Sequence, residues 1–359
     1  MRCIADPVCP ASVDGLDAAA RALFPDVAAG PGVARLNDSL DWYRLIEATA
    51  LPDAQVAAYL TIRQDSTATS VVPMLRGADG RMRGFTTPYT CLYQPPGTVG
   101  LPPSVSRGIG AATGACNSNV LQFDALDPQA AWLEPFCSGL RDAGRVVLRY
   151  EHFGNWWQGL GQGGWTAYLA GRPGALRETI RRRSARVARD PDLRLEMIRG
   201  GDALERGIAG FEAVYARSWK QAEPHPDFNP AMMRMAASLG LLRLGLLWQG
   251  ETAIAAQYWV VADRIAQVLK LAHASEVDAL SPGTVLTAWM IRQLIETEQI
   301  VGLDFGRGDD PYKQHWASQR RPRIGVVAVN PRSVQGSLLL ARHGVGWLRR
   351  HLRQAMLRT

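Results

Sequence analysis

A Ser-Pro-Gly turn at Ser281, Pro282 and Gly283 stands directly before an apolar segment that continues to Glu298. Such a turn predicts the start of a helix, where the first backbone N–H groups have no partner within the helix and lie at the positive end of its dipole. This geometry favours an anion such as a pyrophosphate, and Gly283 leaves room for its close approach. We therefore expect an anion site over residues 281–285.

A second polar stretch follows the helix. It begins with Asp304 at the end of a short predicted strand and continues through Asp309 and Asp310 to Tyr312 and Lys313. Carboxylates and a phenol at a strand end can orient an amine, accept a proton or donate one. Each Asp can equally cap the turn that follows it, and the tyrosine ring can equally pack beneath a helix.

The chain contains only three lysines, Lys220, Lys270 and Lys313, and every other basic side chain is arginine. Lys270 and Lys313 can pair with the nearby carboxylates or contact a carboxylate or phosphate of a substrate. The alternative is that the three lysines have no special role and remain by chance in a sequence whose codon usage favours arginine. Two aromatic residues, Tyr89 in an irregular segment and Trp219 beside Lys220, are further candidates for substrate contact.

The elements that would position these residues follow from hydrophobic periodicity and turn residues. Helices are expected at residues 16–23, 39–47, 130–143, 177–190, 204–221, 230–239 and 284–298. Strands are expected at residues 57–64, 67–76, 82–85, 120–123, 145–150, 241–248, 253–261, 265–271, 301–305 and 324–330. Residues 1–35 should be irregular apart from their helix, and residues 153–164 should be a glycine- and tryptophan-rich connection between two domains.

The chain has 359 residues, of which 47% are hydrophobic and 20% charged, a composition typical of an ordered protein that can form two domains. Its first residues lack the apolar core of a signal peptide, and no segment has the length of a membrane span, so we expect a cytoplasmic protein. The cysteines show no metal-ligand or paired spacing, which predicts free thiols and no metal site. They are Cys3, Cys9, Cys91, Cys116 and Cys137.

Two segments concentrate arginine. Residues 177–190 place six arginines on one predicted helix, which is either a solvated face or a wall for a phosphorylated or nucleic-acid ligand; without interleaved aromatic residues, nucleic-acid binding is not favoured. Residues 334–358 are expected to form a second basic helix, and they contain no acidic residue. We expect it to dock on the protein, with peripheral membrane contact as the alternative.

The order of these elements, with a three-stranded antiparallel meander before the anion turn, resembles that of a GNAT acyltransferase domain. The motifs Ser281–Leu286, Asp304–Lys313 with Trp316, Asn155-Trp156 and Ser218–Lys220 are similar to those of the FemAB/CelD-like acetyltransferase branch. The resemblance covers roughly residues 120–330. One departure is that this chain has a single glycine in the turn, where GNAT loops usually carry two.

The resemblance implies roles for these residues. The strand at 265–271 should diverge from the strand at 301–305, and the pantetheine arm of acetyl-CoA should fill the gap, with Ser281, Pro282, Gly283, Thr284 and Val285 around its pyrophosphate. Tyr312 would protonate the leaving thiolate, and Asp304 or His273 would act as base. The expected substrate-binding residues are Tyr89, Trp219, Lys270, Asp309, Asp310 and Lys313.

These inferences predict a mixed α/β (α+β) fold with tandem GNAT-like domains. The expected boundaries are 1–160 for a degenerate N-terminal domain, 161–335 for the acyltransferase domain and 336–359 for the basic helix. The expected activity is acyl-CoA-dependent N-acyl transfer, with acetyl the expected group, to an amine of a small molecule, a sugar or an envelope precursor. The alternatives are an aminoacyl-tRNA-dependent FemAB-type transferase and a non-catalytic accessory protein of exopolysaccharide assembly. The acceptor, the acyl chain length and the oligomeric state stay open.

Overall fold

The computed structural model describes residues 9–23, 36, 39–64, 67–98 and 100–342. Within them the chain builds a single 12-stranded sheet with the order β1-β2-β3-β4-β5-β12-β6-β11-β10-β9-β8-β7. All neighbouring strands in this sheet are antiparallel except the pairs β4–β5 and β10–β11. The predicted fold class, a mixed and largely antiparallel sheet flanked by helices, is confirmed.

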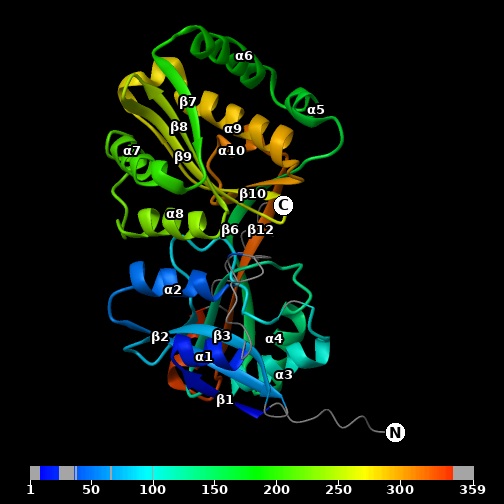
Figure 1. Cartoon of the computed structure of the whole chain (residues 1–359). Coiled ribbons are helices and arrows are strands. Elements are labelled where there is room, and N and C mark those ends of the chain that lie inside the picture. The colour runs from blue at the N-terminus through cyan, green and yellow to red at the C-terminus, as the bar shows by residue number, and fades with distance from the viewer. Residues whose placement is uncertain (1–8, 24–35, 37–38, 65–66, 99, 343–359) are drawn as a thin grey trace, which may run out of the picture.

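The strands alternate with helices along the chain (Figure 1). The strands are β1 (Cys9–Asp14), β2 (Gln55–Gln64), β3 (Thr67–Gly77), β4 (Met82–Gly84), β5 (Val120–Leu126), β6 (Val146–Gly159), β7 (Leu193–Ile198), β8 (Leu242–Gln249), β9 (Thr252–Ala262), β10 (Ile265–His273), β11 (Gly302–Arg307) and β12 (Gln319–Val329). The helices are α1 (Leu16–Leu23), α2 (Leu40–Thr49), α3 (Pro103–Gly114), α4 (Leu133–Asp142), α5 (Gly164–Ala170), α6 (Gly174–Arg189), α7 (Leu204–Ala216), α8 (Phe228–Ser238), α9 (Pro282–Glu298) and α10 (Lys313–Trp316), with 3-10 turns η2 (Gly201–Ala203) and η3 (Ser275–Leu280).

The strands β6 and β12 join the two halves of the molecule. In Figure 1, β1–β5 and α1–α4 form the lower half, β7–β10 and α5–α9 form the upper half, and β6 and β12 run between them. β12 pairs with β5 on one side and with β6 on the other, so the last strand along the chain lies between two strands from its first half.

The connection predicted at residues 153–164 is wrong in its first part, because β6 continues as a strand to Gly159. The segment has weak strand propensity, but its backbone pairs with β12 from Val146 to Trp157 and with β11 from Asn155 to Gly159. This tertiary pairing overrides the local preference of a glycine- and tryptophan-rich segment. β1, α3 and β7 are further elements that the periodicity did not reveal.

Other local predictions are confirmed. Ser39 caps α2, since its Oγ accepts the Trp42 backbone N–H at 3.1 Å. The meander β8–β9–β10 is antiparallel throughout.

The helix predicted at 204–221 ends earlier than expected, at Ala216, because the N–H groups of Arg217 and Ser218 donate to carbonyl oxygens only three residues earlier. Residues 217–227 are therefore a connection between α7 and α8.

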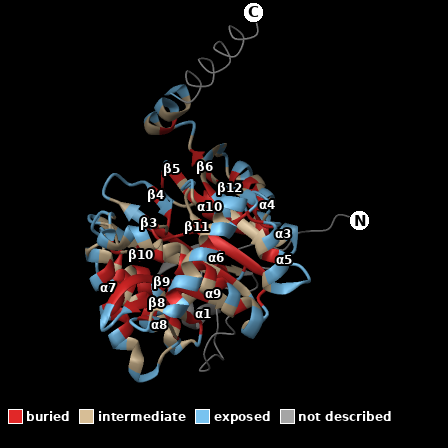
Figure 2. Ribbon diagram, turned by 90° about the horizontal axis from the view of Figure 1, so that it is seen from above, coloured by how far each residue is buried: buried red, intermediate tan, exposed pale blue. Residues whose placement is uncertain are grey.

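Buried residues lie along the strands and on the helices that flank the sheet (Figure 2). One cluster spans both halves, joining α2, β2 and β3 to α7, α8, β8 and β9. A second lies under α9 and includes side chains of α5 and α6, and a third lies under α3 and α4. The described cysteines Cys91, Cys116 and Cys137 are free, as expected.

The C-terminal segment is described only in part. Residues 334–342 are helical, and residues 343–359 lie outside the described part of the chain. The expected docking of the basic C-terminal helix, its arginines at 349, 350, 353 and 358, and its contact with a membrane therefore stay predictions. Among the described helices, none has both the length and the apolar character needed to cross a membrane.

Candidate functional site

A cavity of about 200 Å³ opens where β10 and β11 separate. The two strands pair in parallel from Ile265 to Gln267, opposite Gly302 to Asp304, and the described register ends there. The cavity wall lies on the residues that follow in each strand, with contributions from α2, α8 and three loops. It is lined by Trp42, Pro88, Tyr89, Cys91, Lys220, Phe228, Tyr258, Val268, Leu269, Lys270, Leu271, Phe305, Arg307, Asp310, Tyr312 and Lys313.

A bulge in β10 helps to open this space. The pairing of β10 with β9 shifts by one residue between Val268 and Lys270, which re-aims the side chains that follow. Lys270 thereby lines the cavity. On the other strand, Gly306 has a φ of +66°, and a Cβ at this position would lie 2.9 Å from the Val268 carbonyl oxygen. Only glycine allows this close approach at the point where the strands diverge.

Tyr312 lies in the cavity wall, at the N-terminus of α10. Burial of the phenol and the negative charge of Asp310 raise its pKa well above that of an ordinary tyrosine, so the hydroxyl keeps its proton at neutral pH. No described side chain forms a hydrogen bond with this hydroxyl, and it is therefore available to a ligand in the cavity.

All three lysines line the same cavity. Lys270 Nζ donates to Glu223 Oε1 at 2.5 Å, and Lys313 Nζ pairs with Asp310 Oδ2 at 2.9 Å. Three lysines from separate segments meet at one site. This favours a functional role over lysines left by chance in a sequence whose codon usage favours arginine.

Glu223 is a residue that the sequence analysis missed. Its carboxylate also accepts the hydroxyls of Tyr89, at 2.9 Å, and of Tyr215. Burial opposes ionisation of Glu223, but the hydrogen bonds from Lys270 and Tyr215 and the charge of Lys270 outweigh it and lower its pKa. Its place in a Pro-rich turn before α8 gave no signal of this role, because its partners come from three other segments.

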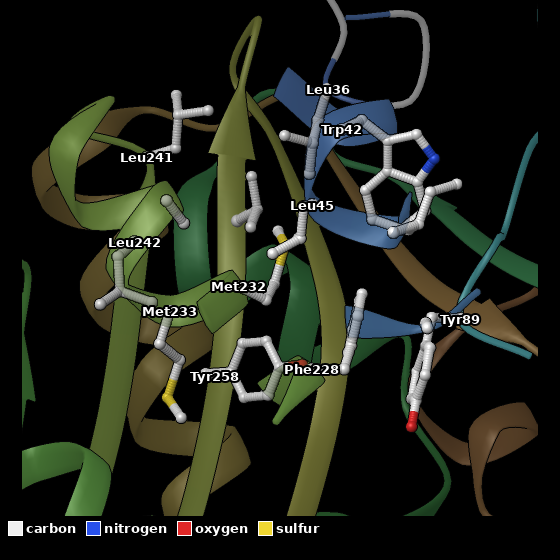
Figure 3. Close-up of a cluster of buried hydrophobic side chains, with 14 of the residues drawn as sticks. Leu36, Trp42, Leu45, Tyr89, Phe228, Met232, Met233, Leu241, Leu242 and Tyr258 are labelled. Atoms are coloured by element: carbon white, nitrogen blue, oxygen red, sulfur yellow. The ribbon is translucent and has the colours of Figure 1, made fainter. Parts of the chain in front are cut away.

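The N-terminal half supplies an aromatic part of the wall. Tyr89 stacks on Phe228 with ring centroids 3.7 Å apart and an interplanar angle of 7°, and Trp42 meets Phe228 edge-on at 6.0 Å. Figure 3 shows these three side chains side by side, near Tyr258 of β9. Tyr89 thus lines the cavity from the irregular segment at 86–96, where the sequence placed it. Trp42 and Phe228 were not foreseen, because each lies within an ordinary apolar helix face.

Asp304 lies outside the cavity lining, in a buried polar network. Its Oδ1 accepts Asn155 Nδ2 at 2.7 Å and the Gly306 backbone N–H at 2.8 Å, and its Oδ2 accepts Arg321 at 2.8 Å. These bonds join β11 to β6 and β12. The catalytic role of Asp304 stays a prediction, and its contacts favour positioning of the β11 turn. Asp309, also outside the lining, pairs with Arg320 at 2.7 Å.

The turn at 281–285 begins α9, as predicted. Ser281 has a φ of +52° and links η3 to the helix, and the Val285 N–H already donates to the Ser281 carbonyl at 3.1 Å. Because Pro282 has no N–H, the free donors of this turn are those of Gly283 and Thr284. None of these five residues lines the cavity described above.

His273 packs against this turn. Its Nδ1 is buried without a hydrogen-bond partner among the described residues and lies 3.1 Å from where a Cβ of Gly283 would be. Its Nε2 is 2.8 Å from Asp278 Oδ1, and its ring lies 4.4 Å from that of Trp219. Trp219 is 56% exposed. His273 and Trp219 stand beside the predicted anion turn and not in the cavity wall.

The structure therefore divides the predicted site residues into three sets. Tyr89, Lys270, Asp310, Tyr312 and Lys313 share the cavity. His273 and Trp219 adjoin the start of α9, while Asp304 and Asp309 support the strands from outside the lining. Among the described residues, no group of three or more His, Cys, Asp or Glu side chains can hold a metal ion.

Part of the chain matches the model of a known protein family. Residues 174–314 match the model of an acetyltransferase (GNAT) domain. This range contains β7 to β11, α9 and Tyr312, and so part of the cavity wall and the turn at 281–285. This part of the chain is thus similar to a GNAT-type acetyltransferase domain, and the similarity supports an acyltransferase.

Solved structures with the same fold cover nearly the whole chain. The C-terminal domain of a putative lysylphosphatidylglycerol synthetase from Agrobacterium fabrum is 14% identical with a TM-score of 0.53, covering 92% of this chain and 97% of that one. FemX is 10% identical with a TM-score of 0.53, covering 90% and 98%. A conserved protein of unknown function from Bacteroides thetaiotaomicron VPI-5482 is 11% identical with a TM-score of 0.55, covering 89% and 99%. At these identities the likeness shows the fold alone. No curated protein sequence matches the chain significantly.

Proposed function

We propose that the protein is an acyl-CoA-dependent N-acyltransferase of the FemAB/CelD-like branch, which transfers an acetyl group to an amine of a small molecule, a sugar or an envelope precursor. The observation that carries the proposal is the cavity between the diverging ends of β10 and β11, with the protonated hydroxyl of Tyr312 in its wall. The two strands and Tyr312 lie within the segment that matches the GNAT domain, while the first half of the chain adds the aromatic part of the wall.

The donor would enter between the two strands. The free N–H groups of Gly283 and Thr284 at the start of a 17-residue helix suit a pyrophosphate, since the helix dipole favours negative charge there. Gly283 has no side chain on the side that faces His273, and a Cβ would reduce the space between them. The gap after Gln267 and Asp304 suits an extended pantetheine arm that reaches the cavity.

The proposed chemistry uses Tyr312 as the acid. The acceptor nitrogen attacks the thioester carbonyl carbon, a C–N bond forms, and the C–S bond breaks as the tetrahedral intermediate collapses. The thiolate takes the proton of the Tyr312 hydroxyl, while the nitrogen loses its own proton to solvent or to a carboxylate. The acceptor attacks as the neutral amine, because an ammonium nitrogen has no free electron pair, and Asp310 in the lining is already paired with Lys313. Asp304 and His273 stay predicted base candidates, although neither lies in the cavity wall.

Calorimetric titration with acetyl-CoA tests the donor, and release of free CoA thiol in the presence of amines tests the transfer. We expect saturable binding in the micromolar to millimolar range and thiol release that depends on an added amine. A heat signal no larger than that of dilution across this range would reject acetyl-CoA as donor. That result would favour the alternative of a non-catalytic accessory protein of exopolysaccharide assembly that has the same fold.

An aminoacyl-tRNA-dependent transferase is the second candidate, favoured by the arginines of α6. Arg181 and Arg182 pair with Glu178, but Arg177, Arg186 and Arg189 are exposed and have no carboxylate partner among the described residues. Binding of tRNA that weakens steeply between 50 and 200 mM salt, together with no binding of acetyl-CoA, would favour this candidate.

The division of the chain is also a proposal. We infer a degenerate N-terminal GNAT-like domain over 1–160, an acyltransferase domain over 161–335 and a basic C-terminal helix over 336–359. The contribution of Trp42, Tyr89 and Cys91 to the cavity supports a substrate-shaping role for the first half. The continuous sheet means that such domains would share strands, because β12 pairs with both β5 and β6.

A further inference from the structure

The cavity contains more positive than negative charge. Its lining includes four cations, Lys220, Lys270, Lys313 and Arg307, whereas one carboxylate, Asp310, lies in the lining and a second, Glu223, lies directly behind it on Lys270. Two positive charges thus remain without a carboxylate. An enclosed site with this balance attracts anions and repels cations.

Two of the four cations are already neutralised. Lys270 is bound to Glu223, whose side chain is 8% exposed. Lys313 Nζ pairs with Asp310 and also donates to the backbone carbonyls of Arg307, at 2.6 Å, and of Gly308, at 3.3 Å. These contacts hold Lys313 in a structural position beneath the β11 turn. Neither ammonium group needs a ligand.

Lys220 differs from the other two lysines. Its ammonium group has no hydrogen bond or ion pair to any described residue, and Nζ lies over the Trp219 ring, 5.6 Å from the centroid. Burial and the neighbouring charge of Lys270 lower its pKa. A partly desolvated ammonium group without an anionic partner is destabilised, and a ligand that supplies the anion removes this cost.

Arg307 is the second cation without a carboxylate partner. Its guanidinium donates to the Thr90 carbonyl at 3.5 Å, lies 3.3 Å from His152 Nε2 and stacks over the Phe153 ring at 4.5 Å. These contacts orient the guanidinium but do not neutralise it. Arg307 therefore adds to the positive potential of the cavity.

Lys220 comes from another segment of the chain than the elements proposed to bind the donor, although its neighbour Trp219 adjoins the anion turn through His273. It lies in the connection between α7 and α8, whereas the anion turn belongs to α9 and Tyr312 follows β11. A lysine that reaches the same cavity from another segment is suited to the second substrate. This step rests on the proposed transfer from acetyl-CoA.

We propose that the amine acceptor carries an anionic group, a carboxylate or a phosphate, and that Lys220 binds this group in the cavity. Arg307 strengthens the attraction without direct pairing. The unmatched charge of Lys220 thus selects zwitterionic or acidic amines over neutral and cationic ones.

Matched pairs of amines test the selectivity. The pairs are 4-aminobutyrate with 4-aminobutanamide, and O-phosphoethanolamine with ethanolamine, so the two arms distinguish a carboxylate from a phosphate. We expect kcat/KM at least tenfold higher for the anionic member of one pair. In Lys220→Gln this ratio should fall to near one, and in Lys220→Arg most of it should remain. Arg141→Gln, which removes an exposed cation from α4, should leave the ratio unchanged.

A binding measurement tests the anion site independently of whether the protein transfers an acetyl group. The chain has only three lysines, so reductive methylation with labelled formaldehyde gives few lysine methyl signals, and the Lys220 signal is the one absent from Lys220→Arg. We expect this signal to shift saturably with the anionic amines and not with the neutral ones. If it does so while no amine is acetylated, the anion site stands and the transferase function fails.

Three outcomes would overturn the anion site. The first is equal turnover of both members of each pair, which would leave the transferase proposal standing. The second is a Lys220 signal that no anionic amine moves. The third is a Lys220 shift produced by CoA alone that excludes the anionic amine, since the lysine would then belong to the donor phosphates.

Discussion

Tyr312 has the two properties that a proton donor to a thiolate needs. Its ring is held in the cavity wall, and burial together with the charge of Asp310 raises its pKa, so the acid form persists above the usual range of a phenol. Raising the pH toward 10 should therefore cost little activity through this residue. The alternative of a ring packed only beneath a helix does not explain a hydroxyl without a protein partner.

Tyr312→Phe should reduce kcat on the order of 10²-fold, the usual contribution of a positioned acid. The dissociation constant of acetyl-CoA should change less than about twofold, because the ring remains in place. Single-turnover acetyl transfer and calorimetry measure the two quantities. Full activity of the variant would remove Tyr312 from the mechanism.

Glu223→Gln tests the charge at the back of the cavity. The folded-state pKa of Glu223 is lower than its ordinary value, so its contribution to stability is present above that value and is lost as pH falls through the folded pKa. At pH 7 the variant should lose about 2 kcal/mol, since hydrogen bonds to a charged group are each worth about 1.5–3 kcal/mol. As the pH falls below the ordinary carboxyl range, the difference between the two proteins should shrink.

Urea unfolding at pH 7 and at pH 3.5 measures this difference. Glu212→Gln, at an exposed position of α7, is the matched control and should behave as wild type at both values. A stability loss in Glu223→Gln that is equally large at both pH values would contradict an ionised, paired Glu223.

At the scale of elements, the site depends on where two strands stop pairing and where a helix begins. β10 and β11 separate after three paired positions, and the same loop that leaves β10 starts α9. The 3-10 turn η3 and the left-handed Ser281 connect the end of β10 to the start of α9. At the single glycine of the turn, Gly283, a Cβ would lie 3.1 Å from His273 Nδ1.

Gly283→Val should weaken acetyl-CoA binding at least tenfold while the protein stays folded. The added Cβ would lie 3.1 Å from His273 Nδ1, and the two methyl groups need further space beside the proposed pyrophosphate site. Calorimetry and far-UV circular dichroism follow binding and folding. Gly161→Val, where a Cβ meets nothing within 4 Å, controls for the substitution itself and should bind normally. Wild-type affinity in Gly283→Val would place the pyrophosphate elsewhere.

At the scale of the whole molecule, one apolar cluster and two long strands couple the halves. Phe228 of α8 is 2% exposed and contacts Tyr89 and Trp42 of the first half. Tyr89 from the irregular segment at 86–96 stacks on Phe228 of α8, and both side chains line the cavity. Neither half completes the site by itself.

Phe228→Ala should destabilise the protein by about 3–5 kcal/mol, as expected for a large buried aromatic side chain. We expect one cooperative urea transition, shifted to lower concentration, because the cluster belongs to both halves. Val56→Ala, at a position 66% exposed, should shift the transition little. An unchanged midpoint in Phe228→Ala, or a separate transition for each half, would contradict this coupling.

The sequence by itself determined the local features of this protein. The meander β8–β10, the start of α9 at the Ser-Pro-Gly turn and the cap of α2 follow from alternation, turn residues and capping, which act over a few neighbouring residues. The same signals identified Tyr312 and two lysines as candidates, since unusual residue types in polar turns are visible without a structure.

Only the tertiary structure decided what comes together. The strand character of β6 beyond Tyr150 depends on pairing with β12, more than 150 residues later in the chain. Glu223, Phe228 and Trp42 are ordinary in their local sequence and gain their roles from partners in other segments. Lys220 shows the difference most clearly. Its residue type was visible in the sequence, but the absence of an anionic partner among the described residues depends on long-range packing, which local periodicity does not encode.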